Sequence, residues 1–190
     1  NIENRGTITT PKTLAMQTGY NTVDGVVTAV ANTSLLNSGA IQAGNLSMNA
    51  VKEVSLLSGG DVTSQGTAYV SATKVSNAAT LTAQNASVVA NEVSNQGVMQ
   101  TTGLLNVSGK NGISNSGTMR AGTLTLATDE KISNASCLLW VLCSKGTMSA
   151  DKITITAPKI AAISDLNGTY TTQVLELNKP AATPATDTSL

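Results

Sequence analysis

Residues 113–127 read ISNSGTMRAGTLTLA, and this stretch holds one full copy of a pattern that recurs along the chain. It opens with a turn signal, Asn115-Ser116-Gly117, which leads to the apolar Met119. A second turn at residues 120–122 precedes residues 123–127, where apolar and polar side chains alternate with a period of two. That alternation indicates a short strand with one buried face.

The phrase Asn-x-Gly-x-apolar returns at nearly constant spacing. Close copies begin at Asn4, Asn37, Asn95 and Asn115, and looser copies begin at Ser58, Asn77 and Asn134. A period of about 20 residues, with short apolar pairs between turns, is typical of a solenoid. Leucine-rich repeats would need a line of leucines that is missing here, and helical repeats have a longer period.

Each copy predicts three short strands separated by three corners, so the expected fold is an all-β, single-stranded parallel β-helix. Coils of this kind stack at about 4.8 Å, and nine or so coils would make a rod on the order of 40 Å long. We expect the solenoid to cover residues 1–177, with residues 18–25 forming a less regular coil. Residues 178–190 form a tail rich in Pro, Ala and Thr without apolar periodicity.

The composition excludes several classes of function. Aromatic residues make up 2% of the chain and Phe is absent, so Val, Ile, Leu, Ala and Met must fill the core. The 11 basic residues balance the 11 acidic ones without clustering, which argues against nucleic acid as a partner. The absence of His removes the commonest metal ligand and general base. No segment is apolar and long enough to predict a membrane-spanning helix, and no signal peptide opens the chain.

The recurring Asn and Gly have a structural and a functional interpretation. Stacked Asn side chains could bond coil to coil, and Gly suits a position that needs positive φ or a close backbone approach. The functional alternative is a row of ligand-binding amides, whereas a phosphate-binding loop lacks both its motif and its helix. We expect a structural ladder, and its predicted members are Asn37, Asn77, Asn95, Asn115, Asn134, Gly39, Gly97 and Gly117.

Acidic residues raise the alternative of a polysaccharide-acting enzyme, because many parallel β-helices degrade polysaccharides with paired carboxylates. The carboxylates nearest the repeat corners are Glu53, Glu92, Asp129, Glu130 and Asp151. They fall on different coils, most of them beside lysines, which is typical of solvated corners and not of a convergent pair. The sequence therefore predicts no catalytic, cofactor or metal site.

One segment departs from the repeat. The phrase begins at Asn134 and again at Ser144, only ten residues later, so an insertion interrupts this coil at residues 137–145. In a secreted protein the two lone cysteines, Cys137 and Cys143, would form a disulfide, worth about 2–2.5 kcal/mol in the chain-entropy model. The apolar residues between them either fold onto a wall of the solenoid or form an exposed contact for a receptor or lipid headgroups. These residues are Leu138, Leu139, Trp140, Val141 and Leu142.

Residues 37–48, 113–126 and 132–134 closely resemble the repeats of filamentous haemagglutinin-type proteins. Such repeats occur in exoproteins of bacterial two-partner secretion systems, which include large adhesins and contact-dependent growth-inhibition effectors. The resemblance covers roughly residues 37–156. It implies a right-handed parallel β-helix within a long surface filament that is secreted through an outer-membrane β-barrel partner. Cysteines are scarce in such rods, so the insertion is unusual.

The resemblance implies an internal rod segment, secreted to the bacterial surface, that projects an adhesive, receptor-binding or toxin region. Its partners would be the β-barrel secretion protein and a receptor on an outer membrane or host cell. The first alternative is a receptor-binding segment that uses the Cys137–Cys143 loop. The second is the polysaccharide-acting enzyme described above.

Overall fold

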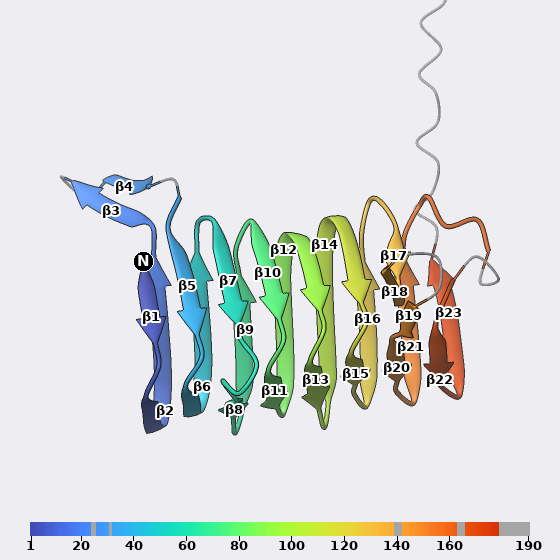
Figure 1. Ribbon diagram of the computed structural model, residues 1–190, viewed down its shortest axis with the longest axis horizontal. Coiled ribbons are helices and arrows are strands. Elements are labelled where there is room, and N and C mark those ends of the chain that lie inside the picture. Colours follow the sequence, from blue (N-terminus) through green and yellow to red (C-terminus); the bar gives the residue numbers. More distant parts are fainter. Residues whose placement is uncertain (24–25, 31, 139–141, 163–165, 179–190) are drawn as a thin grey trace, which may run out of the picture.

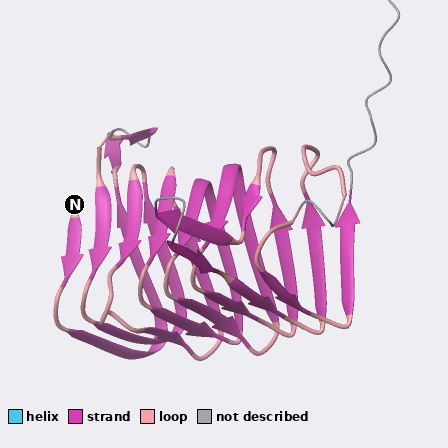
Figure 2. Cartoon of the chain, turned by 45° about the vertical axis from the view of Figure 1, so that its right-hand side comes forward, coloured by secondary structure: helices cyan, strands magenta, loops and turns pink. Residues whose placement is uncertain are grey.

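The structure is a computed structural model that describes residues 1–23, 26–30, 32–138, 142–162 and 166–178. For residues 20–23, 26–29, 136–138 and 142–144 it describes the backbone alone. The chain is a parallel β-solenoid of about six turns, with about 21 residues per turn (Figure 1). The described part contains no helix, and so none long and apolar enough to cross a membrane (Figure 2).

Each turn visits three walls, named A, B and C in chain order. Wall A consists of β1 (Ile2–Asn4), β5 (Ser34–Asn37), β7 (Glu53–Leu56), β10 (Lys74–Asn77), β17 (Ile132–Ser133) and the second halves of β12 (Asn85–Asn95) and β14 (Leu104–Asn115). Wall B consists of β8 (Val62–Ser64), β11 (Thr80–Ala83), β13 (Val98–Thr101), β15 (Thr118–Arg120), β20 (Thr147–Ser149), β22 (Thr169–Thr171) and the first parts of β2 (Thr7–Thr18) and β6 (Ala40–Ala50). Wall C consists of β9 (Thr67–Ser71), β16 (Thr123–Ala127), β21 (Lys152–Thr156), β23 (Val174–Asn178) and the remaining parts of β2, β6, β12 and β14.

Side chains stack in columns because the strands of each wall are parallel and in register. On wall B, Ile41, Val62, Leu81, Met99, Met119 and Met148 follow one another into the interior, and each is at most 1% exposed. The buried apolar residues of the described part are all Met, Leu, Ile, Val or Ala. The predicted aliphatic core is therefore confirmed, as are the three strands per turn.

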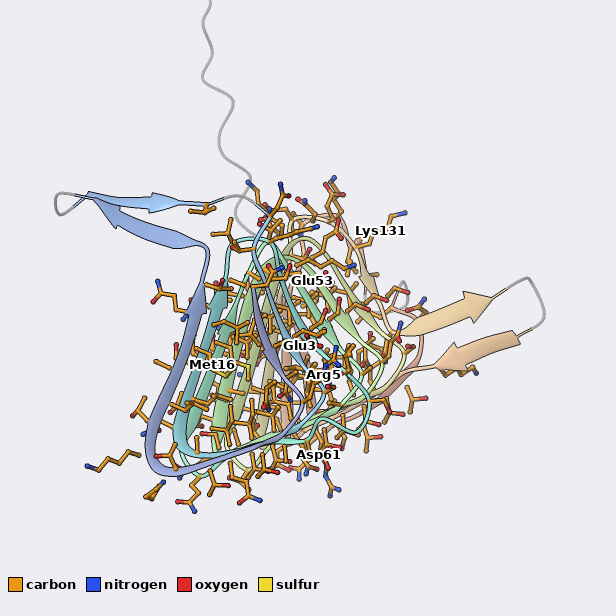
Figure 3. The ribbon with its side chains drawn as sticks, turned by 60° about the vertical axis from the view of Figure 1, so that its left-hand side comes forward. Glu3, Arg5, Met16, Glu53, Asp61 and Lys131 are labelled. Carbon is orange, nitrogen blue, oxygen red and sulfur yellow. The ribbon has the colours of Figure 1, made fainter. Side chains whose placement is uncertain are left out.

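The number of turns is smaller than the nine expected from the sequence. Two antiparallel hairpins consume residues without adding turns: β3 (Tyr20–Val23) with β4 (Val26–Ala29), and β18 (Ala135–Leu138) with β19 (Leu142–Lys145). The first hairpin leaves the rod between walls C and A, and the second leaves it between walls A and B (Figure 3).

The β3–β4 hairpin corrects the expectation of a coil at residues 18–25. Its strands pair Val23 with Val26 in antiparallel register, so the chain reverses direction between these two residues. Asp-Gly between apolar residues is a strong hairpin signal, because both central positions of the favoured turn require positive φ. The signal was present in the sequence, but it conflicts with the parallel repeat.

The repeat glycines mark where successive turns come closest. A Cβ added to Gly39, Gly97 or Gly117 would lie 2.0–2.2 Å from a backbone carbonyl oxygen of the preceding turn. None of these three residues has a positive φ. Close approach of two backbones, and not left-handed geometry, therefore requires glycine at these three positions.

We expect Gly117→Ala to lower the free energy of unfolding by about 1–3 kcal/mol, because its Cβ would collide with the Gly97 carbonyl. Gly6→Ala is the matched control, since Gly6 opens the first copy of the same phrase and an added Cβ there meets nothing within 4 Å. Urea unfolding of both variants measures the difference. Equal stability of the two variants would contradict the close-approach explanation.

Candidate functional site

The repeat asparagines form a buried ladder at the corner between walls A and B. Asn77, Asn95, Asn115 and Asn134 are each at most 1% exposed. In each pair the Nδ2 group donates to the Oδ1 atom of the next asparagine, over 2.7, 2.7 and 2.6 Å in chain order. Each amide also donates to a backbone carbonyl of the following turn. Every polar atom of these amides is used within the fold, which leaves no row of amides for a ligand.

The ladder is interrupted once. Asn4 donates to Asn37 over 2.8 Å, but the next position in register is Leu56. The sequence pattern placed this copy at Ser58, which is wrong by two positions. The corner after Leu56 is longer than in neighbouring turns and includes Gly59, with φ of 82°. Asn37 therefore donates to the backbone oxygens of Gly39 and Gly60.

We expect Asn95→Leu to lower the free energy of unfolding by roughly 2–4 kcal/mol, because each buried polar group left unpaired costs about 1–3 kcal/mol. Leu is the informative replacement, since the rod accepts it in this column at position 56. Ser94→Ala, one residue away on the outward side, should change stability by less than about 0.5 kcal/mol. Chemical unfolding compares the two variants, and a neutral Asn95→Leu would contradict the role assigned to the ladder.

The outer faces of the rod are polar and shallow. Wall A carries an outward column formed by Ser55, Ser76, Ser94, Ser114 and Ser133. A furrow of about 280 Å³ crosses this column, and Lys74, Glu92 and Lys131 line it. A second furrow, of about 480 Å³, follows Gln100 and Arg120 on wall B and contains no carboxylate.

Several of the described carboxylates pair with lysines on the surface. Glu53 pairs with Lys74 over 3.8 Å, and Glu176 pairs with Lys152 over 2.8 Å. Glu130 contacts Lys159. All three pairs are at least partly solvent-exposed, so each contributes little to stability. Within the described residues no group of three His, Cys, Asp or Glu side chains could hold a metal ion.

Tyr170 occupies the end of the inward column on wall B, next to Met148. Burial raises the pKa of its hydroxyl to about 12, and the nearby Asn134 side chain partly offsets this shift. The hydroxyl is buried without a hydrogen bond of normal geometry. Tyr170 thus ends the inward column of wall B with an aromatic ring in the place of another methionine. The repeat pattern did not predict this feature.

The insertion predicted at residues 137–145 is the β18–β19 hairpin. Figure 3 shows its two strands running away from the solenoid, which does not favour the interpretation that this segment folds onto a wall. Leu139, Trp140 and Val141 lie outside the described residues, as do the side chains of Leu138 and Leu142. The predicted contact residues therefore remain a prediction.

The backbone register pairs Cys137 directly with Cys143 across the hairpin. Directly opposed residues of antiparallel strands have Cα atoms about 4.5–5.5 Å apart, which lies within the range that a disulfide spans. The register is therefore compatible with the predicted disulfide.

We expect the protein purified from an oxidising compartment to contain no free thiol, as measured by thiol titration and non-reducing peptide mass spectrometry. Replacing both cysteines with serine should speed amide exchange in β18 and β19, because an isolated hairpin is only marginally stable. Exchange in β14 and β16 should stay unchanged. A freely titratable thiol in the oxidised protein would contradict the pairing.

Comparison with protein-family models, with curated proteins and with solved structures found no match to this chain.

Proposed function

We propose that this chain is an internal rod segment of a large secreted bacterial surface filament. The observation that carries the proposal is the continuous register of the three walls, held by the Asn and Gly corner through most of the turns. Stacked coils with unbroken backbone ladders make a stiff spacer, because each coil contacts only its neighbours and the whole extends along one axis. Such a spacer suits the projection of an adhesive, receptor-binding or toxin region.

The resemblance of residues 37–156 to filamentous haemagglutinin-type repeats supplies the biological setting. In that setting an outer-membrane β-barrel partner secretes the filament, and the rod folds outside the cell. An oxidising location agrees with the opposed cysteines of the β18–β19 hairpin. Neither furrow is lined by more than one carboxylate, which supports a non-enzymatic role, since glycosidases need two carboxylates about 5–10 Å apart.

A second candidate function is receptor binding by the β18–β19 hairpin. The hairpin leaves the rod at the corner between walls A and B, and the sequence from Leu138 to Leu142 is entirely apolar. Where an apolar segment of this kind is exposed, it marks a contact for a protein receptor.

The test uses an antibody raised against this segment and the full-length protein in its own cells. We expect labelling of intact cells, and we expect the labelling to disappear when the gene for the β-barrel secretion partner is deleted. A cytoplasmic protein, labelled only after permeabilisation, serves as control. Labelling that requires permeabilisation in wild-type cells would overturn the proposal.

A deletion of residues 136–145 separates the two candidates in the same cells. It joins Asn134-Ala135 to Gly146-Thr147-Met148 and so restores the uninterrupted repeat phrase. A rod segment should remain at the surface with its function intact, whereas a hairpin receptor site should lose attachment to target cells.

A further inference from the structure

The first turn of the rod has an open stacking face. Within the described residues, β1 pairs only with β5 and β2 only with β6, so the opposite edge of each strand is unpaired (Figure 1). Ile8 and Leu14 are half-buried there, while their partners in the next turn, Ile41 and Leu46, are 0% and 2% exposed. Unpaired edges backed by exposed core are surfaces on which another strand can add.

The Asn ladder gives this face a specific chemistry. Every Asn–Asn bond runs in one direction, with Nδ2 of one turn donating to Oδ1 of the next. Asn95, Asn115 and Asn134 thus accept from a preceding asparagine, whereas Asn4, like Asn77 after Leu56, has no such donor among the described residues. The Oδ1 atom of Asn4 accepts only from the Gly6 backbone N–H, at 3.2 Å. The open face therefore presents a free acceptor position where an amide donor fits.

Gly6 is a second, independent indication that another turn fits against this face. The later corner glycines are required because an added Cβ would strike the preceding turn, at 2.0 Å for both Gly39 and Gly117. Gly6 has ordinary backbone geometry, and a Cβ there would meet nothing within 4 Å. Nothing in the described chain requires glycine at this position, whereas the backbone of one more preceding turn would.

The opposite end of the rod has a different chemistry. Asn134 donates to the backbone oxygen of Thr169, and its own N–H is bound by the side chain of Asn167. Tyr170 occupies the adjacent interior, and among the described residues no strand follows β17 on wall A. In the last described turn the ladder position, four residues before Tyr170, is Leu166, so the end of a second copy would offer Asn4 no asparagine amide in register.

We propose that the β1–β2 face binds a further coil of the same polypeptide, one that precedes Asn1 in a longer protein and carries Asn at the ladder position. This inference rests on the proposed role as an internal rod segment and assigns the contact through which the rod continues. The coil donates its amide to Asn4 Oδ1 and lays its backbone over Gly6.

The test adds a copy of residues 74–91 directly before Asn1 in the full chain. Ile2 shares its column with Val75 and Val93, so the copy continues the register. It also places an asparagine 18 residues before Asn4, the separation between Asn77 and Asn95. We expect amide exchange of the β2 residues to slow by about tenfold or more. Unchanged protection of β16 shows that the rod is folded.

Two variants test the named contacts. Leu at the copied Asn77 should remove most of the gain, because the donor to Asn4 is gone. Gly6→Ala should have no effect in the original chain but should abolish the gain in the extended one. The inference is overturned if the copy leaves β2 exchange unchanged, or if both variants protect β2 as well as the parent copy does.

Sedimentation of the original chain at rising concentration tests the other occupant. We expect a monomer. A head-to-tail dimer that protects β2 would show that a second copy of the chain, and not a preceding coil, binds this face. Either failure leaves the surface-labelling result untouched, so the inference and the proposed function can fail separately.

Discussion

The close approach of successive turns at the corner between walls A and B is the constraint on which the rest of the rod depends. Strands in register lie about 4.7–4.9 Å apart, which leaves no room for a side chain between corner backbones. Glycine permits this approach, and the approach in turn lets Asn95 reach Asn115 over 2.7 Å. The Asn and the Gly of the repeated phrase therefore act together, and neither explains the fold alone.

The contacts of these Asn and Gly residues also explain where the rod tolerates extra chain. The β18–β19 hairpin is inserted between Asn134 and Gly146, yet Asn115 still bonds to Asn134, and Met119 still stacks on Met148. The residues that flank the insertion make the contacts, so the inserted segment only has to leave and return at one corner. Loop-closure entropy rises slowly with length, which makes such insertions inexpensive. New binding surfaces can thus arise at corners while the walls stay constant.

The sequence predicted the period, the three walls and the ladder, because the turn chemistry and the alternation agree in those turns. It misplaced one copy of the phrase by starting it at Ser58, since the register pairs Asn37 with Leu56. The coil expected at residues 18–25 was wrong because residues 20–29 form an antiparallel hairpin, although the repeat period predicted another parallel coil there. Tyr170 was missed because only stacking on Met148 shows that it ends a column. The contact proposed at Trp140 lies outside the described residues.

A ladder whose amides all donate in one direction makes the two ends of the rod chemically different. An end-to-end contact between separate copies would set Asn4 against Leu166, so the Asn4 Oδ1 atom would keep only its bond from the Gly6 N–H. A coil of the same chain with asparagine in register would add a second hydrogen bond to this atom. Exposed strand edges normally invite aggregation. Here the direction of the side-chain hydrogen bonds discriminates between continuation of one polypeptide and association of many, a distinction that backbone edges alone cannot make.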